Sequence, residues 1–208
     1  MFETIIDKVK NKDLIIFGEI HGTREIPKMI SDFFSEYAKE NDFNLCFEFP
    51  EEFQGKVDDF FKEPNLDGRN SREYLDLINN LKELNKKYNR KIKVFCIDPD
   101  KDTQEEREKG IAKNILENLS NKKTFAILGE IHASKNPIFF KEQNIITAGS
   151  ILLNKLKDKM FSIRLVPTKG KFYNFGVKEI IEGNLEDLFN KNFDVVVDVG
   201  EVSACSFR

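Results

Sequence analysis

The 208-residue sequence has almost no excess of charge of either sign and no long apolar run. Its 33 Lys and Arg nearly balance its 36 Asp and Glu, so the net charge of -3 offers no broad cationic surface for nucleic acid or anionic lipid. No uncharged segment approaches the roughly 18 residues that a membrane span needs, and the N-terminus lacks the pattern of a signal peptide. We therefore expect a cytoplasmic protein that binds neither nucleic acid nor membrane.

Cysteine is also scarce, with three residues and no Cys-x-x-Cys pair. Three thiols cannot all be paired within one chain, which suits a reducing compartment. Cys46 and Cys96 each lie inside an apolar stretch. Because a free cysteine packs as a small hydrophobic residue, we predict that both are buried core thiols and not nucleophiles.

Three common catalytic signatures are missing from the sequence. It contains no Gly-x-Ser-x-Gly elbow, no Walker phosphate loop and no Gly-x-Gly-x-x-Gly fingerprint. The sequence therefore lacks the motifs that usually indicate a serine hydrolase, a P-loop NTPase or a classical dinucleotide-binding enzyme.

What the sequence does contain is an alternation of short apolar runs and amphipathic segments. The runs predict strands at 13–17, 44–49, 91–97 and 124–128, and the periodicity predicts helices at 27–39, 104–119 and 151–156. A hairpin is predicted from 161–166 and 171–175 around Lys169-Gly170, followed by a last apolar run at 195–197. The alternation predicts a single α/β domain over 1–208, with a largely parallel central sheet covered by helices on both faces.

The segment from about 53 to 88 interrupts this alternation. It is rich in charge and has helical periodicity, clearest at Tyr74, Leu75, Ile78 and Leu81. We interpret it as a helical insertion and a candidate lid over the functional site.

The most informative feature is a repeated tetrapeptide, Gly-Glu-Ile-His. It occurs at 18–21 and again at 129–132, each time directly after an apolar strand. The sequence contains only two histidines, His21 and His132, and the motif uses both. A lone histidine at a strand end is more often structural, but two in the same context favour a functional site.

The spacing within the motif has a physical reading. In an extended segment, side chains two residues apart point to the same side, so Glu19 is expected beside His21 and Glu130 beside His132. The motif glycines would leave room for a close approach by a ligand or by another backbone. Ligands of open parallel sheets bind beyond the carboxyl ends of the strands, where both motifs lie.

Further candidate residues follow the neighbouring strands. Glu48 follows Phe47, and Asp98 precedes Pro99, at the ends of the second and third predicted strands. Each has a simpler reading, because Glu48 could be an exposed strand end and Asp98 could form an Asx turn. Arg24 and Glu25, just beyond the first motif, could be a charge pair at a helix start.

These residues resemble a known superfamily, that of erythromycin esterases, ChaN and Tiki proteins. The resemblance is carried by 18–25 together with Glu48, by 107–115, which contains Arg107, and more weakly by 148–152. It implies a cleft lined by Glu and His on an α/β sheet. Erythromycin esterases hydrolyse a lactone, Tiki proteins are metal-dependent proteases, and ChaN-type lipoproteins bind haem.

Two mechanisms fit the residues, and both predict a hydrolase acting on an ester, lactone or peptide bond of a small molecule or peptide. In the first, His21 or His132 is the general base on a water, Glu19 or Glu48 orients the imidazole, and Arg24 or Arg107 stabilises the oxyanion. In the second, a divalent Zn²⁺, Mn²⁺ or Co²⁺ ion binds to ligands drawn from the histidines and carboxylates, namely His21, His132, Glu19, Glu48, Glu130 and Asp98.

The alternative from another class is a ChaN-like protein that binds haem or metal through the two histidines without turnover. The choice between these readings and the oligomeric state both stay open at the level of the sequence.

Overall fold

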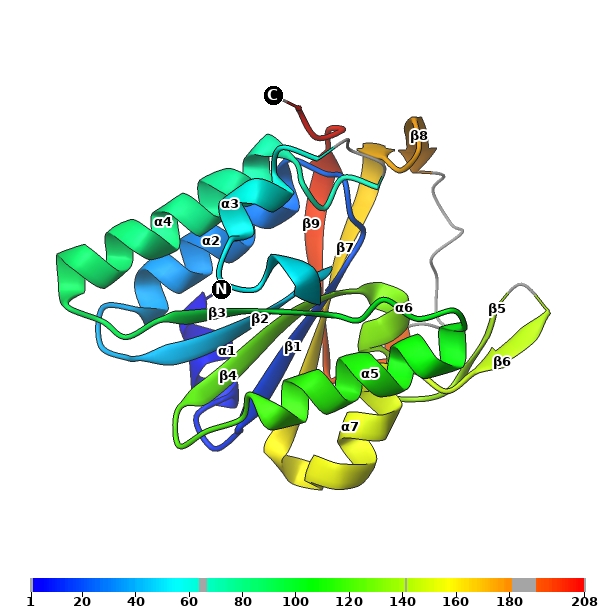
Figure 1. The fold of residues 1–208 in the computed structure, drawn as a ribbon, viewed down its shortest axis with the longest axis horizontal. Coiled ribbons are helices and arrows are strands. Elements are labelled where there is room, and N and C mark those ends of the chain that lie inside the picture. The colour runs from blue at the N-terminus through cyan, green and yellow to red at the C-terminus, as the bar shows by residue number, and fades with distance from the viewer. Residues whose placement is uncertain (1, 64–66, 141, 181–189, 208) are drawn as a thin grey trace.

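A computed structural model describes residues 2–63, 67–140, 142–180 and 190–207 and has a seven-stranded sheet at its centre (Figure 1). The strands are β1 (Leu14–Glu19), β2 (Phe43–Pro50), β3 (Lys93–Asp98), β4 (Lys123–Gly129), β7 (Met160–Tyr173), β8 (Val177–Ile180) and β9 (Val195–Val202). Their order is β3-β2-β4-β1-β7-β8, with β9 also pairing with β7, and only the β7–β8 pair is antiparallel. The predicted α/β fold with a largely parallel sheet is confirmed.

Helices cover both faces of this sheet. They are α1 (Phe2–Lys8), α2 (Glu25–Tyr37), α3 (Val57–Phe60), α4 (Arg72–Tyr88), α5 (Gln104–Glu117), α6 (Glu130–Ala133) and α7 (Ala148–Leu156). Figure 1 shows α2 and α4 side by side on one face and α5 and α7 on the other. Among these described helices, none has the length and apolar character to cross a membrane.

Alternation along β1 explains why both faces are covered. Ile15 and Phe17 pack into a core with α2 and α4, whereas Leu14 and Ile16 pack into a second core with α5 and α7. All four side chains are buried. A strand with apolar residues at every position therefore needs a helical layer on each side.

The predicted helical insertion is a layer of the fold. Helix α4 begins at an N-cap, Ser71, whose hydroxyl accepts from the backbone N–H of Tyr74, and it ends at Asn89 in the left-handed conformation. Its apolar stripe packs into the core beside α2. The lid interpretation is therefore wrong for α4. Among the described residues of 53–88, those that line the functional cleft are Asp67 and Arg69, which lie in the connection before this helix.

The C-terminal hairpin exists, but its turn lies elsewhere than predicted. Strand β7 continues through Lys169 and Gly170 to Tyr173, because β9 pairs with it in parallel as far as Gly170. The chain then turns at 174–176 and returns as β8. A second, short hairpin from β5 (Ile138–Phe140) and β6 (Gln143–Ile145) was not predicted.

The predicted burial of the strand cysteines is confirmed. Cys46 on β2 and Cys96 on β3 are free, buried thiols. Burial raises the pKa of Cys46 to about 12 and that of Cys96 to about 11. Neither thiol carries an appreciable thiolate fraction at neutral pH, so neither is suited to nucleophilic chemistry.

We expect Cys46→Ala to lower the free energy of unfolding by about 1 kcal/mol, because it removes a sulfur from a filled core and leaves a small cavity. Urea denaturation of the variant and its parent measures this difference. Any hydrolytic activity should be retained in Cys46→Ala and in Cys96→Ala. A folded variant of either kind that has lost turnover would show that the thiol takes part in the chemistry.

Candidate functional site

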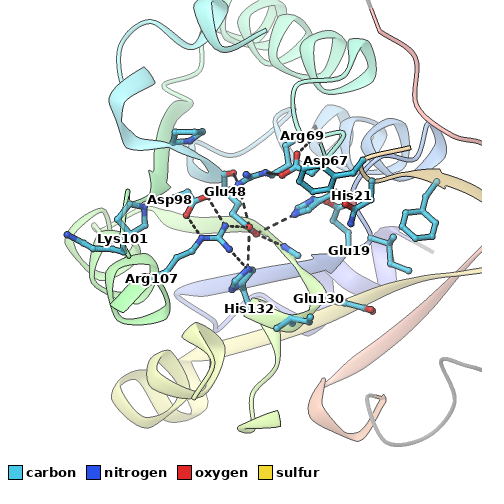
Figure 2. Close-up of a pocket in the computed structure, with 18 of the residues that line it drawn as sticks. Glu19, His21, Glu48, Asp67, Arg69, Asp98, Lys101, Arg107, Glu130 and His132 are labelled. Atoms are coloured by element: carbon cyan, nitrogen blue, oxygen red, sulfur yellow. Dashed lines mark hydrogen bonds and ion pairs between the residues drawn. The ribbon is translucent and has the colours of Figure 1, made fainter. Parts of the chain in front are cut away.

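A cleft of about 1440 Å³ opens at the carboxyl edge of the sheet (Figure 2). Its floor is formed by residues at or just after the ends of β1, β2, β3 and β4. The predicted candidates among its lining residues are Glu19, His21, Glu48, Asp98, Arg107, Glu130 and His132. The structure thus brings together residues that lie as much as 113 positions apart, Glu19 and His132.

Glu48 lies at the centre of this floor, between the two imidazoles (Figure 2). Its side chain is 4% exposed. One carboxylate oxygen accepts from the backbone N–H of Gly129 at 2.7 Å, and the other accepts from Arg107 at 2.8 Å. Burial acts to raise the pKa of Glu48, but the hydrogen bond and charge of His21 and the charge of Arg107 outweigh it and hold the pKa well below its usual range. Glu48 is therefore a buried carboxylate anion.

His21 forms a pair with Glu19 through its Nδ1 atom. The same oxygen of Glu19 accepts from the Tyr74 hydroxyl at 2.7 Å, which fixes the carboxylate from the α4 side. The other ring nitrogen, Nε2, faces Glu48 at 3.6 Å. Burial lowers the pKa of His21, but the carboxylates of Glu19 and Glu48 outweigh this effect and raise the pKa to about 10. His21 is therefore an imidazolium at neutral pH.

His132 has a different set of partners. Its Nδ1 atom lies 2.7 Å from a carboxylate oxygen of Glu108, and its Nε2 atom lies 3.0 Å from Arg107 Nη1 and 3.4 Å from Glu48. A guanidinium can only donate, so Nε2 must accept, and the ring proton is then on Nδ1, which donates to Glu108. This geometry assigns His132 as a neutral imidazole with its lone pair directed toward the cleft.

Glu108 on α5 is a site residue that sequence reasoning missed. It is fully buried, and besides His132 it accepts from Gln104 Nε2 at 2.6 Å and from the backbone N–H of Ala148 at 2.7 Å. Its carboxylate therefore links α5, α6 and α7. The one available signal was its place next to Arg107 in the segment that resembles the superfamily.

The prediction that Glu130 lies beside His132 is wrong. The strand ends at Gly129, and 130–133 form a helical turn, in which residues two apart point to nearly opposite sides. Glu130 instead pairs with the buried Arg164 of β7 at 2.8 Å. Burial raises the pKa of Glu130 against the opposing effect of Arg164. Glu130 still lines the cleft but leaves the orientation of His132 to Glu108.

Asp98 fixes two arginines at the cleft floor. Each of its oxygens accepts from Arg107 at 2.7 Å, and one also accepts from Arg69 at 2.6 Å. Arg69 comes from the connection before α4 and also donates to the backbone carbonyl of Glu48 at 2.7 Å and to Asp67 at 2.8 Å. Arg69 was not predicted as a site residue, because it lies in the charged segment 53–88, away from the repeated motif and from the predicted strand ends.

Arg24 and Glu25 lie outside the cleft, which corrects their assignment to the site. Arg24 donates to the backbone carbonyl of Ala204 at 2.9 Å, and Glu25 accepts from the backbone N–H of Ser203 at 2.8 Å. Both residues fasten the C-terminal segment to the start of α2.

The donor set does not fit a bound metal ion. Across the described ranges, no three His, Cys, Asp or Glu side chains are arranged to hold one. The would-be ligands Glu48, Asp98 and His132 are each hydrogen-bonded to a guanidinium, which already supplies the positive charge that a divalent cation would bring. Haem ligation would require the two Nε2 atoms to turn away from the Glu48 carboxylate, which lies 3.6 Å from His21 and 3.4 Å from His132.

No protein-family model and no curated protein matches the chain. Solved structures do match it. A succinoglycan biosynthesis protein superposes with a TM-score of 0.79 at 12% identity, over 100% of this chain and 92% of that one. A mutant of the erythromycin esterase EreC in its open conformation superposes with a TM-score of 0.64 at 9% identity, over 86% of this chain and 78% of the other. The chain shares its fold with an erythromycin esterase.

A third solved structure is RRSP, a MARTX toxin effector domain from Vibrio vulnificus. It superposes with a TM-score of 0.51 at 12% identity, over 94% of this chain and 39% of that one. At such identities the likeness establishes the fold alone.

The proton on His21 couples folding to pH. Its folded pKa of about 10 exceeds the ordinary value of 6.5, so its contribution to the free energy of unfolding is fully present below pH 6.5 and is lost as the pH rises through 10. We expect the difference in that free energy between the parent and His21→Gln to decrease over this interval, as measured by urea denaturation. Taking the difference cancels other groups that titrate at alkaline pH. A difference that does not change with pH would contradict a protonated His21.

Proposed function

We propose that the protein is a hydrolase of carboxylic ester, lactone or peptide bonds that uses His21 and His132 as an acid–base pair. One observation carries the proposal. Two imidazoles from separate strand ends face the same ionised carboxylate, and their partners leave one protonated and the other neutral. A pair of titratable groups that local contacts keep in opposite protonation states is suited to acid and base duty in one reaction.

In the proposed reaction, His132 is the general base. A water molecule that displaces the Arg107 contact gives its proton to Nε2 of His132 while its oxygen attacks the carbonyl carbon. When the bond from that carbon to the leaving oxygen or nitrogen breaks, Nε2 of His21 donates its proton to the leaving atom. The products are a carboxylic acid and an alcohol or amine. The proton gained by His132 then passes through solvent in the cleft to His21, which restores the starting state.

The arginines supply the electrostatic part of the catalysis. Arg107 is held by two hydrogen bonds to Asp98 and lies next to the proposed attacking water, so its guanidinium is placed to stabilise the oxyanion. Its charge is fixed before the substrate binds, because Asp98 and Glu48 hold it in place. Glu48, with its low pKa and its two donors, is a poor base and serves as the counter-charge between the imidazoles.

The identity of the acid and the base is tested by a pH profile. With ethyl acetate as substrate, whose alkoxide leaving group needs a proton, we expect kcat to fall above about pH 10, where His21 loses its proton. His21→Asn and His132→Asn should each lower kcat by about 100-fold or more. Arg24→Gln is the matched control, because Arg24 adjoins the first motif but lies outside the cleft, and it should retain parental kcat. Parental rates in both histidine variants would refute the proposal.

The two motif glutamates should differ in their effect on this profile. Glu19→Gln removes the carboxylate paired with His21, so the alkaline limb should move down by about one pH unit or more. Glu130→Gln keeps that pair intact and should move the limb much less. The measurement is kcat against pH for both variants. Equal shifts in the two variants would show that Glu19 does not set the protonation of His21.

A further inference from the structure

Phe175 is an exposed aromatic residue in a strained backbone conformation. It lies in the turn between β7 and β8 with a φ of 52°, in the left-handed region that bulky residues rarely adopt. Its side chain is 71% exposed, so its burial does not compensate for this strain. A glycine or asparagine would suit the position better for folding. An unfavourable residue of this kind is a reason to look for a function.

The turn that carries Phe175 belongs to the wall of the cleft. Phe172, Asn174, Phe175 and Ile180 of the hairpin all line the cavity whose floor holds the two imidazoles. The wall is therefore continuous with the proposed reaction centre. Phe139, on the β5–β6 hairpin, is 72% exposed but does not line the cleft.

The hairpin is fixed, next to its turn, to the residue after His21. The backbone N–H of Tyr173 donates to the carbonyl of Gly22 at 2.9 Å, and the N–H of Cys205 donates to the same carbonyl at 2.8 Å. Gly22 has a φ of +81°, and a Cβ there would lie 1.9 Å from the Tyr173 carbonyl oxygen. Only glycine permits this approach, which sets the distance between hairpin and imidazole.

The charge of the cleft limits which chemical groups of a substrate can bind against this wall. Of the described residues that line it, nine are Asp or Glu and three are Lys or Arg. Two of those cations, Arg69 and Arg107, are already paired with acids at the floor. An anionic group on the substrate would therefore meet net repulsion, whereas an apolar group would contact Phe172 and Phe175.

We propose that the β7–β8 turn is an apolar subsite that selects uncharged esters or lactones with a large apolar group. This inference rests on the proposed hydrolase function. The carbonyl of the substrate lies at the imidazoles, and its apolar group lies on Phe175, which gains at binding the burial that it lacks in folding. The subsite selects substrates by the chain length or ring size of the apolar group on one side of the scissile bond.

The kinetic test compares p-nitrophenyl octanoate with p-nitrophenyl acetate. In the parent, kcat/KM should favour the octanoate, and Phe175→Gly should reduce that preference about tenfold. Glycine relieves the backbone strain, so the variant should fold at least as stably as the parent. Phe175→Leu should restore part of the preference, and Phe139→Ala should keep all of it. An unchanged octanoate preference in Phe175→Gly would overturn the subsite.

A binding measurement separates this inference from the hydrolase proposal. The probe is 2-octanone, a ketone that cannot be hydrolysed, with acetone as the short control, measured by isothermal titration calorimetry. The subsite predicts that 2-octanone binds to the parent and to Phe139→Ala and binds about tenfold more weakly to Phe175→Gly. Such binding without hydrolysis of any ester would support the subsite and refute the hydrolase. Ester hydrolysis with equal 2-octanone affinity in parent and Phe175→Gly would support the hydrolase and refute the subsite.

Discussion

The buried charge of Glu48 is the constraint on which the site depends. A carboxylate removed from water carries a large desolvation cost unless donors and cations surround it. Here the Gly129 amide and Arg107 donate to it, and both imidazoles face it. These groups come from different elements, so the charge of Glu48 can be stabilised only when β1, β2, β4 and α5 are assembled. Folding and formation of the site are therefore coupled.

The side chains around Glu48 are in turn kept in place by a second set of acids. Asp98 holds Arg107, Glu19 holds His21, and Glu108 holds His132. Each acid sets the orientation or protonation of the group it contacts. The result is a preorganised cleft in which the charges are already arranged before a substrate enters, which is the condition under which electrostatic stabilisation of a transition state costs least.

The two copies of the tetrapeptide show how one local sequence can take two roles. In the first copy, the chain stays extended through Glu19, and this acid pairs with the histidine of its own motif. In the second copy, the chain turns into α6 after Gly129, so Glu130 pairs with Arg164 and His132 receives its carboxylate from α5. The two imidazoles thus reach equivalent places beside Glu48 with unequal partners, and their protonation states differ as a consequence.

The sequence by itself determined the α/β class and the buried strands, and it placed both histidines at strand ends on one edge of the sheet, because these features depend on local periodicity and on the position of the motifs. It could not determine which acid meets which imidazole, since that depends on whether the chain after Gly129 continues as strand or turns into helix. The places of Arg69 and Glu108 in the site became apparent only from the tertiary structure. The contacts that give them their roles, Arg69 with Asp98 and Glu108 with His132, join segments that are separate in the sequence and form only once the layers pack.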